Sequence, residues 1–250
     1  MRTEIKDRGY FERYSAEIEM IITRSKMWLS EGSIAQERIK IVKDDIRSQY
    51  LKLAILKYSA GFPFETIKEA VNNVLNNVDS DWAGQWKLNH KGKEYDQYIL
   101  SAYDEMLWML SLGYLVDVSN EAFGKLVNLI DRDQVKDFLF EFIIRTKVAD
   151  RPILSAESYR DFFGVPKVFE KLRQAISEAD KSKSEKLIHD FISKDWYKNH
   201  KDAGWYNAHK SKHDVFYGYW SFETAAVVKI MSLDETKFID CQYYPKDLVK

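Results

Sequence analysis

The stretch GYWSFETAAVVKIM, residues 218–231, carries the clearest indication of how the chain folds. It opens with bulky aromatic residues and runs into Ala225 and Ala226, whose small side chains allow another helix to approach closely, and then into aliphatic residues. Aromatic side chains bury a large apolar area while their hydroxyl and N–H groups seek hydrogen-bond partners. We therefore interpret this stretch as core leading into a helix, rather than as a ligand pocket.

The polar residues around this stretch have structural explanations. Ser221 is a candidate N-cap, which places Glu223 in the first turn of a helix, where the dipole favours an acid. A carboxylate bonded to nearby Tyr or Trp donors is the alternative for Glu223. A tail containing Pro245 does not continue a helix, so we expect it to be extended and to fold back over the same core. The predicted structural motif comprises Tyr219, Trp220, Phe222, Glu223, Tyr243, Tyr244 and Pro245.

Helical spacing of apolar residues recurs along the rest of the chain, which has only four prolines and ten glycines in 250 residues. Strand-like alternation is hard to find. We predict an all-α fold, a compact multi-helix array of about ten helices in two packed halves. Ser119 is a predicted cap for one helix, and Ser33 with Gln36 is a possible capping box for another. The other predicted helices lie at roughly residues 10–31, 34–61, 64–78, 95–116, 134–148, 155–163, 166–180, 184–200 and 221–231.

Two short polar stretches are candidate boundaries between the halves. They are Arg132-Asp133 and Asp150-Arg151-Pro152, and neither is a flexible linker of the Gly/Ser kind. We therefore predict an N-terminal helical region at residues 1–131 and a C-terminal helical region, which carries the aromatic motif, at residues 132–250.

Composition and charge narrow the class of protein. Hydrophobic residues make up 45% and charged residues 31%, as in ordinary globular proteins, and the net charge of -1 provides no overall field that recruits nucleic acid or a membrane. The single cysteine, Cys241, fits a reducing compartment. The charged N-terminus does not resemble a secretory signal, and the longest uncharged apolar run, residues 106–116, is too short to span a bilayer. We expect a cytoplasmic protein.

Motifs of nucleotide-binding and hydrolytic enzymes are missing from the sequence. GxxxxGK[ST], GxGxxG, GxSxG and HExxH do not occur in the contexts that their chemistry needs. We predict no catalytic residue, no cofactor and no metal. The alternative is a helical metal-dependent hydrolase that uses His200, His209 and His213, since positions i and i+4 share a helix face. Lys210 and Lys212 oppose a bound cation there, so ordinary structural or surface histidines are favoured.

The C-terminal quarter of the chain resembles a known family. GYWSFETAAVVKI, followed by FID and YYPKDLV, is similar to the C-terminal region of PoNi-type immunity proteins of bacterial polymorphic toxin systems. The upstream segment DWYKNHKDAGWYNAHKSKHDVFYGYW also resembles that family. The resemblance implies an all-helical protein without enzymatic activity that binds and neutralises a cognate toxin. It also implies that the toxin is typically a DNase, often delivered by type VI secretion.

Acidic residues are unevenly distributed. No Lys or Arg lies between Lys93 and Lys125, or between Lys68 and Lys87, although both intervals contain acids. A nuclease presents a positive groove to DNA phosphates, so an inhibitor that occludes the groove should present carboxylates, although merely solvated acids are the alternative. The predicted helix at residues 95–116 would turn Asp104 and Glu105 towards water. The predicted toxin-binding residues are Glu94, Asp96, Asp104, Glu105, Glu69, Asp79 and Asp81. The toxin's identity and the chain's oligomeric state stay open.

Overall fold

The computed structural model describes residues 1–78, 86–155 and 165–249 of the chain. It divides into two compact units. The N-terminal unit comprises Met1–Gln85 and Asn207–Gly218, and the C-terminal unit comprises Trp86–Tyr206 and Tyr219–Lys250. The helix predicted at residues 155–163 falls almost entirely outside the described residues. The compact units are divided after Gln85, Tyr206 and Gly218. The predicted boundary between residues 131 and 132 stays a prediction.

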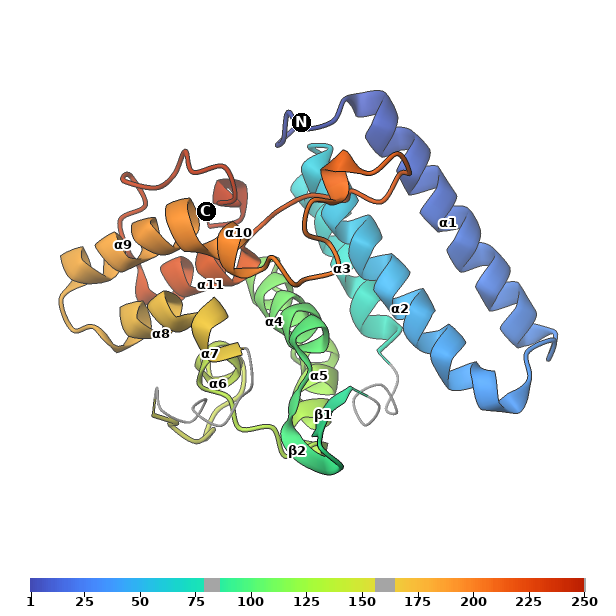
Figure 1. The fold of residues 1–250 in the computed structure, drawn as a ribbon, viewed down its shortest axis with the longest axis horizontal. Coiled ribbons are helices and arrows are strands. Elements are labelled where there is room, and N and C mark those ends of the chain that lie inside the picture. Colours follow the sequence, from blue (N-terminus) through green and yellow to red (C-terminus); the bar gives the residue numbers. More distant parts are fainter. Residues whose placement is uncertain (79–85, 156–164, 250) are drawn as a thin grey trace. The chain divides into compact units, whose positions relative to one another are not determined.

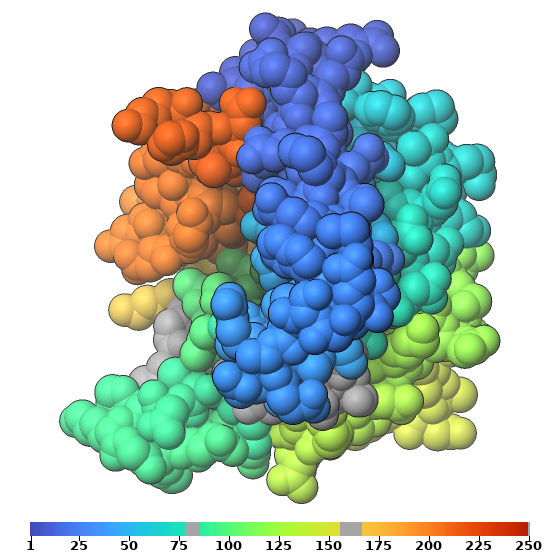
Figure 2. All heavy atoms as spheres, turned by 90° about the vertical axis from the view of Figure 1, so that its right-hand side faces the viewer, coloured from blue at the N-terminus to red at the C-terminus, as the bar shows by residue number. Residues whose placement is uncertain are grey.

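Three helices build most of the N-terminal unit: α1 (Arg8–Ser30), α2 (Gln36–Ser59) and α3 (Phe64–Asn76) (Figure 1). Helix α2 packs against both α1 and α3, and Figure 2 shows the outer side chains of α1 and α2. Asp7 caps α1, because its Oδ1 accepts a 2.7 Å hydrogen bond from the Tyr10 amide. The predicted capping box of Ser33 and Gln36 is wrong, since the N-cap of α2 is Ala35 and makes no side-chain hydrogen bond.

Residues 207–218 return to the N-terminal unit and complete its core. The Phe216 amide donates a 2.8 Å hydrogen bond to the Tyr10 hydroxyl, and the Phe216 ring centroid lies 6.3 Å from that of Phe11. The Ser59 hydroxyl donates to the Tyr217 carbonyl at 2.8 Å. The C-terminal aromatic cluster is therefore shared: Phe216 and Tyr217 belong to one unit, and the aromatic residues from Tyr219 onward belong to the other.

Helix α4 (Leu100–Leu115) forms the centre of the C-terminal unit. Helices α5 (Asn120–Arg132), α6 (Phe138–Ile144) and α11 (Phe222–Met231) pack against it (Figure 1). Ser119 caps α5 by accepting from the Ala122 amide, as predicted. The remaining elements are α7 (Val165–Val168), α8 (Glu170–Ser177), α9 (Lys181–Asp190), a π-helical turn (Phe191–Asp195), α10 (Trp196–Asn199) and a final 3-10 turn (Lys246–Leu248). The prediction of a mostly helical fold is confirmed.

A β-hairpin stands where the sequence predicted the start of a helix. Strands β1 (Lys87–His90) and β2 (Lys93–Tyr98) pair antiparallel, so the helix predicted from residue 95 begins only at Leu100. The two turn residues, Lys91 and Gly92, have φ angles of 53° and 78°. Two-residue turns with positive φ match the right-handed twist of paired strands, which explains how this short polar stretch closes a hairpin.

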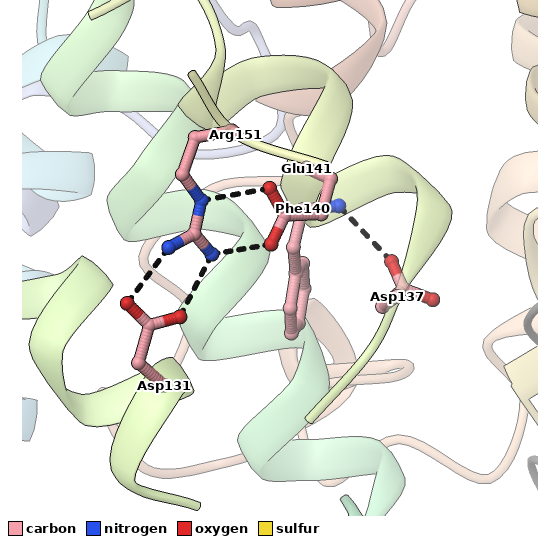
Figure 3. Close-up of polar contacts among 5 residues, drawn as sticks. All are labelled: Asp131, Asp137, Phe140, Glu141 and Arg151. Carbon is pink, nitrogen blue, oxygen red and sulfur yellow. Dashed lines mark hydrogen bonds and ion pairs between the residues drawn. The ribbon is translucent and has the colours of Figure 1, made fainter. Parts of the chain in front are cut away.

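A buried polar network ties three helices of the C-terminal unit together. Asp137 Oδ1 accepts from the Leu139 and Phe140 amides and so caps α6; Figure 3 draws the bond from Phe140. The same carboxylate accepts from the Tyr103 hydroxyl of α4 at 2.8 Å and from Arg173 Nη2 of α8 at 3.1 Å. Asp137, Tyr103 and Arg173 are fully buried. A buried ion pair with several hydrogen bonds is costly to break from one side.

The prediction that the aromatic motif is core is confirmed. Trp220 and Phe222 are 5% and 1% exposed. The Ser221 amide donates a 2.9 Å hydrogen bond to the Tyr243 carbonyl, so the tail folds back over this core as predicted. The prediction that the tail is extended is wrong for Lys246–Leu248, which form a 3-10 turn directly after Pro245. Ser221 is the N-cap of α11, but its hydroxyl bonds to the Glu223 carboxylate rather than to the helix backbone.

Candidate functional site

A cleft of about 690 Å³ opens in the C-terminal unit beside strand β2. This volume lies within the range of ordinary ligand pockets. Its walls come from β2, the end of α5, the α5–α6 connection, α6 and the segment after α6. The lining residues are Tyr95, Asp96, Gln97, Ile130, Asp131, Gln134, Val135, Lys136, Glu141, Arg151 and Pro152.

Arg151 binds two carboxylates in one wall of the cleft (Figure 3). Its Nη1 and Nη2 atoms bond to both oxygens of Asp131 at 2.7 and 2.8 Å, and its Nε bonds to Glu141 Oε2 at 3.0 Å while Nη2 bonds to Glu141 Oε1. These hydrogen bonds, to Asp131 first and then to Glu141, raise the pKa of the guanidinium above its ordinary value. Bidentate pairs of this kind fix geometry as well as charge. They anchor the segment after α6 to α5 and α6.

A β-bulge in β2 supplies two further lining residues of the cleft. Lys87 of β1 pairs with Tyr98 and Leu88 pairs with Tyr95, so Asp96 and Gln97 have no partner residue on β1. A bulge re-aims side chains that regular pairing would fix. Both of these residues line the cleft. Gln97 is only 3% exposed, yet neither its Oε1 nor its Nε2 has a hydrogen-bond partner among the described residues.

The two predicted acids of the hairpin are exposed, but they are already paired. Lys87 Nζ lies 2.7 Å from Asp96 Oδ1 and 3.3 Å from Glu94 Oε1. The hydrogen bond to Asp96 is the main reason why the pKa of Lys87 is raised. The side chains of Asp96 and Glu94 stay 58% and 61% exposed, so a partner protein can still reach them. Their negative charge is partly compensated by this lysine.

The expectation that Asp104 faces water is wrong. Asp104 is 2% exposed, and its Oδ1 lies 3.5 Å from Nε2 of His200, which is 1% exposed. Helix α4 is buried on almost every side, so it has no broad solvent-facing stripe on which this acid could stand. Glu105 is half-buried. Asp104 therefore acts within the core of its unit, and it is not available on a surface for a partner.

The other predicted acids lie elsewhere in the chain. Glu69 is exposed on α3 and belongs to the N-terminal unit, whereas Glu94 and Asp96 belong to the C-terminal unit. Asp79 and Asp81 lie outside the described residues. The structure thus brings together Glu94 and Asp96 of the predicted set and does not group the others with them.

The alternative metal site does not assemble as a helix face. His209 lies in the 3-10 turn Ala208–Lys210, which ends before His213, so the two imidazoles do not share a turn of helix. His200 belongs to the other unit and is buried against Asp104. Within residues 1–78, 86–155 and 165–249, no group of three or more His, Cys, Asp or Glu side chains could hold a metal ion.

A second buried cluster surrounds Glu223. Trp196 Nε1 and the Ser221 hydroxyl each donate a 2.6 Å hydrogen bond to Glu223 Oε1, which confirms the alternative of a carboxylate held by an aromatic donor. Burial raises the pKa of Glu223 to about 7, although these hydrogen bonds act in the opposite direction. Burial alone would lower the pKa of His200, but Asp104 and the hydrogen bond to the Trp196 carbonyl outweigh it, so that pKa is raised. The ring packing around these residues identifies the cluster as core.

Sequence reasoning missed Gln97, Asp131, Glu141 and Arg151 as residues of a site. In the sequence, Arg151 belongs only to the candidate boundary Asp150-Arg151-Pro152. The one available signal was Lys91-Gly92, a glycine-containing pair between short polar segments that is compatible with a hairpin turn. Nothing local in the sequence indicated that the bulge would bury an amide.

Comparison with protein families decides where the chain belongs. A family model described as PoNe immunity protein (PoNi), N-terminal, matches residues 4–128, and one described as PoNe immunity proteins (PoNi), C-terminal, matches residues 135–248. The chain belongs to the PoNe immunity protein family. It is thus an immunity protein against a polymorphic toxin. Membership of the PoNi family implies that this chain binds a cognate toxin.

Among solved structures, this PoNi chain is similar to "The Crystal Structure of Protein PA2201 from Pseudomonas aeruginosa". The TM-score is 0.72 at 15% sequence identity, over 99% of this chain and 89% of that one. At this identity the likeness shows a shared fold and nothing more. No curated protein matches the sequence. Among the described residues, no helix is long and apolar enough to cross a membrane.

Proposed function

We propose that the toxin neutralised by this PoNi protein is a DNase, and that neutralisation occurs by occlusion of its DNA-binding groove. The observation that carries this proposal is the pair of exposed carboxylates on β2, Glu94 and Asp96. Asp96 also lines the cleft, whose other charged residues are Asp131, Lys136, Glu141 and Arg151. DNA-binding surfaces are positively charged, so exposed carboxylates complement them and steer association. Asp104 takes no part in this surface because it is buried. Glu69 on α3 is a further exposed candidate, and Glu105 is a half-buried one.

The proposal includes the setting in which binding takes place. The resemblance to PoNi-type proteins supports a toxin delivered by type VI secretion, and the single Cys241 fits the reducing cytoplasm of the protected cell. Binding there is stoichiometric, because an immunity protein that acts by occlusion must remain on its toxin.

The test is a titration in a DNA-cleavage assay. The protein encoded by the gene next to that of this chain is purified as the candidate toxin and mixed with increasing amounts of the PoNi protein, and cleavage of plasmid DNA is measured. Cleavage should fall linearly and end near one equivalent, and active toxin should be recovered after the complex is dissociated. Inactivation of excess toxin by a trace of PoNi protein would contradict occlusion. A toxin that leaves DNA intact but remains lethal would overturn the DNase proposal alone.

A further inference from the structure

Gln97 is one of several described residues with buried polar atoms that lack a hydrogen-bond partner, and it is the one whose amide lacks a partner for both its oxygen and its nitrogen. A buried polar group normally has a hydrogen-bond partner, and one without a partner keeps its full desolvation cost. Gln97 has a donor group and an acceptor that are both buried, and neither is bonded to any described residue. An apolar side chain at this position would avoid that cost, so the amide indicates a role outside the free protein.

The backbone around Gln97 places this residue in the lining of the cleft. The bulge releases Asp96 and Gln97 from the ladder, and both side chains line the cleft. Arg151, which lines the same cleft, is bonded to Asp131 and Glu141. A lining held by these ion pairs, with an unsatisfied amide among its residues, resembles a preformed site, in which a few polar groups orient a ligand.

The chemistry of the cleft indicates the occupant. A carboxamide offers one acceptor and two donors in one plane, which complements a main-chain peptide group that presents both its N–H and its C=O. Among the lining acids, Glu141 is almost buried against Arg151, whereas Asp131 and Asp96 keep side chains that are 49% and 58% exposed. Asp131 is already paired with Arg151 and Asp96 with Lys87, and Lys136 also lines the cleft, but the exposed parts of these two carboxylates can still accept from a basic side chain next to the bound peptide group.

We infer that this cleft binds an extended segment of the toxin that carries a Lys or Arg, with one of its main-chain peptide groups paired to Gln97. This inference rests on the proposed function, because it takes the toxin as the partner. Edge strands commonly receive extended peptides through main-chain hydrogen bonds, with neighbouring pockets for side chains. Here the bulged Gln97 provides the paired group through its side chain.

Gln97→Met provides the decisive variant. Methionine has a similar length but lacks both hydrogen-bonding atoms. The melting temperature of the Gln97→Met variant should therefore be equal to or above that of the native chain. Its dissociation constant for a catalytically inactive toxin, measured by calorimetry, should rise by about tenfold or more. A group that is merely structural would behave in the opposite way, with a lower melting temperature and unchanged affinity. Gln174→Met, at an exposed position on α8, is the matched control and should change neither quantity.

Two further measurements separate the possible failures. Hydrogen exchange of the native complex should show protection at residues 93–98 and 130–136. Overlapping synthetic peptides of the toxin should include one that binds the native chain and fails to bind Gln97→Met, and this peptide should contain Lys or Arg. If the toxin binds tightly while Gln97→Met binds equally and β2 is unprotected, this inference is wrong and the proposed function stands. If the native chain does not bind the toxin at all, both fail.

Discussion

The indole Nε1 of Trp196 and the carboxylate Oε1 of Glu223 are 2.6 Å apart, in a hydrogen bond that joins α10 to α11 inside the core. Glu223 is fully buried and its second oxygen, Oε2, has no hydrogen-bond partner among the described residues. A carboxylate held this way is desolvated on one side, which is why its pKa is raised to about 7.

This pKa predicts that stability falls as pH rises. The folded-state pKa of Glu223 is above its ordinary value of 4.5, so its protonated form favours folding, and this stability is lost between about pH 4.5 and pH 7. The shift corresponds to a loss on the order of 3 kcal/mol. The raised pKa of His200 acts in the same direction, because its stabilisation is lost as pH rises above 6.5.

Glu223→Gln should remove most of this dependence. Its Oε1 can still accept from Trp196 and Ser221, and the charge is gone, so the variant should match the native chain at pH 5 and exceed it at pH 8. Urea unfolding at both pH values measures the difference, with the exposed Glu170→Gln as control. Parallel pH profiles for Glu223→Gln and the native chain would show that Glu223 does not titrate in this range.

Trp220→Ala should destabilise the fold by about 3–5 kcal/mol, because it removes a large buried side chain and leaves a cavity. Thermal or urea unfolding measures this change. An unchanged melting temperature combined with lost toxin binding would instead move Trp220 from the core to an interface. Trp28→Ala, at a position on α1 that is 38% exposed, is the control and should cost much less.

Arg151→Met should cost about 3 kcal/mol, because it leaves Glu141, whose side chain is 6% exposed, as an uncompensated buried charge. The double variant Arg151→Met with Glu141→Met should recover most of that loss, since both charges are gone. Urea unfolding of the two single variants and the double variant gives the coupling energy. Additive losses would show that the two side chains do not stabilise each other.

Charge reversal on the hairpin tests the acidic surface. Glu94→Lys with Asp96→Lys should weaken toxin binding and leave folding nearly unchanged, because exposed ion pairs such as those with Lys87 contribute little. Most of the effect should appear in the association rate and should shrink at high salt, since charges are screened over about 8 Å at physiological ionic strength.

The matched control for this reversal is Asp240→Lys with Asp202→Lys, two exposed acids of the same unit. Surface plasmon resonance at low and high salt compares the association rates. Equal rates for both double variants would exclude Glu94 and Asp96 from the toxin interface. The acids that would then need testing are Glu69 and Glu105.

Local patterns were sufficient for much of the fold. Apolar spacing predicted α1, α2 and α3, and the cap at Ser119 follows from the preference of its hydroxyl for a free helix N–H. The aromatic motif was predicted to be core because several large aromatic side chains close together along the chain bury a large apolar area. These predictions succeeded because the decisive interactions lie within one turn of helix or within one apolar face.

Tertiary structure alone decided the site. The sequence favoured a helix from residue 95, but the turn at Lys91 and Gly92 and the pairing with β1 outweigh weak helix preferences, and the bulge then determines where Gln97 points. The helical spacing of apolar residues predicted that Asp104 faces water. The segments that pack around α4 bury it beside His200 instead. Arg151 meets Asp131 and Glu141 because the chain folds back on itself after α6. Burial and long-range pairing depend on distant segments, so no local pattern contains them.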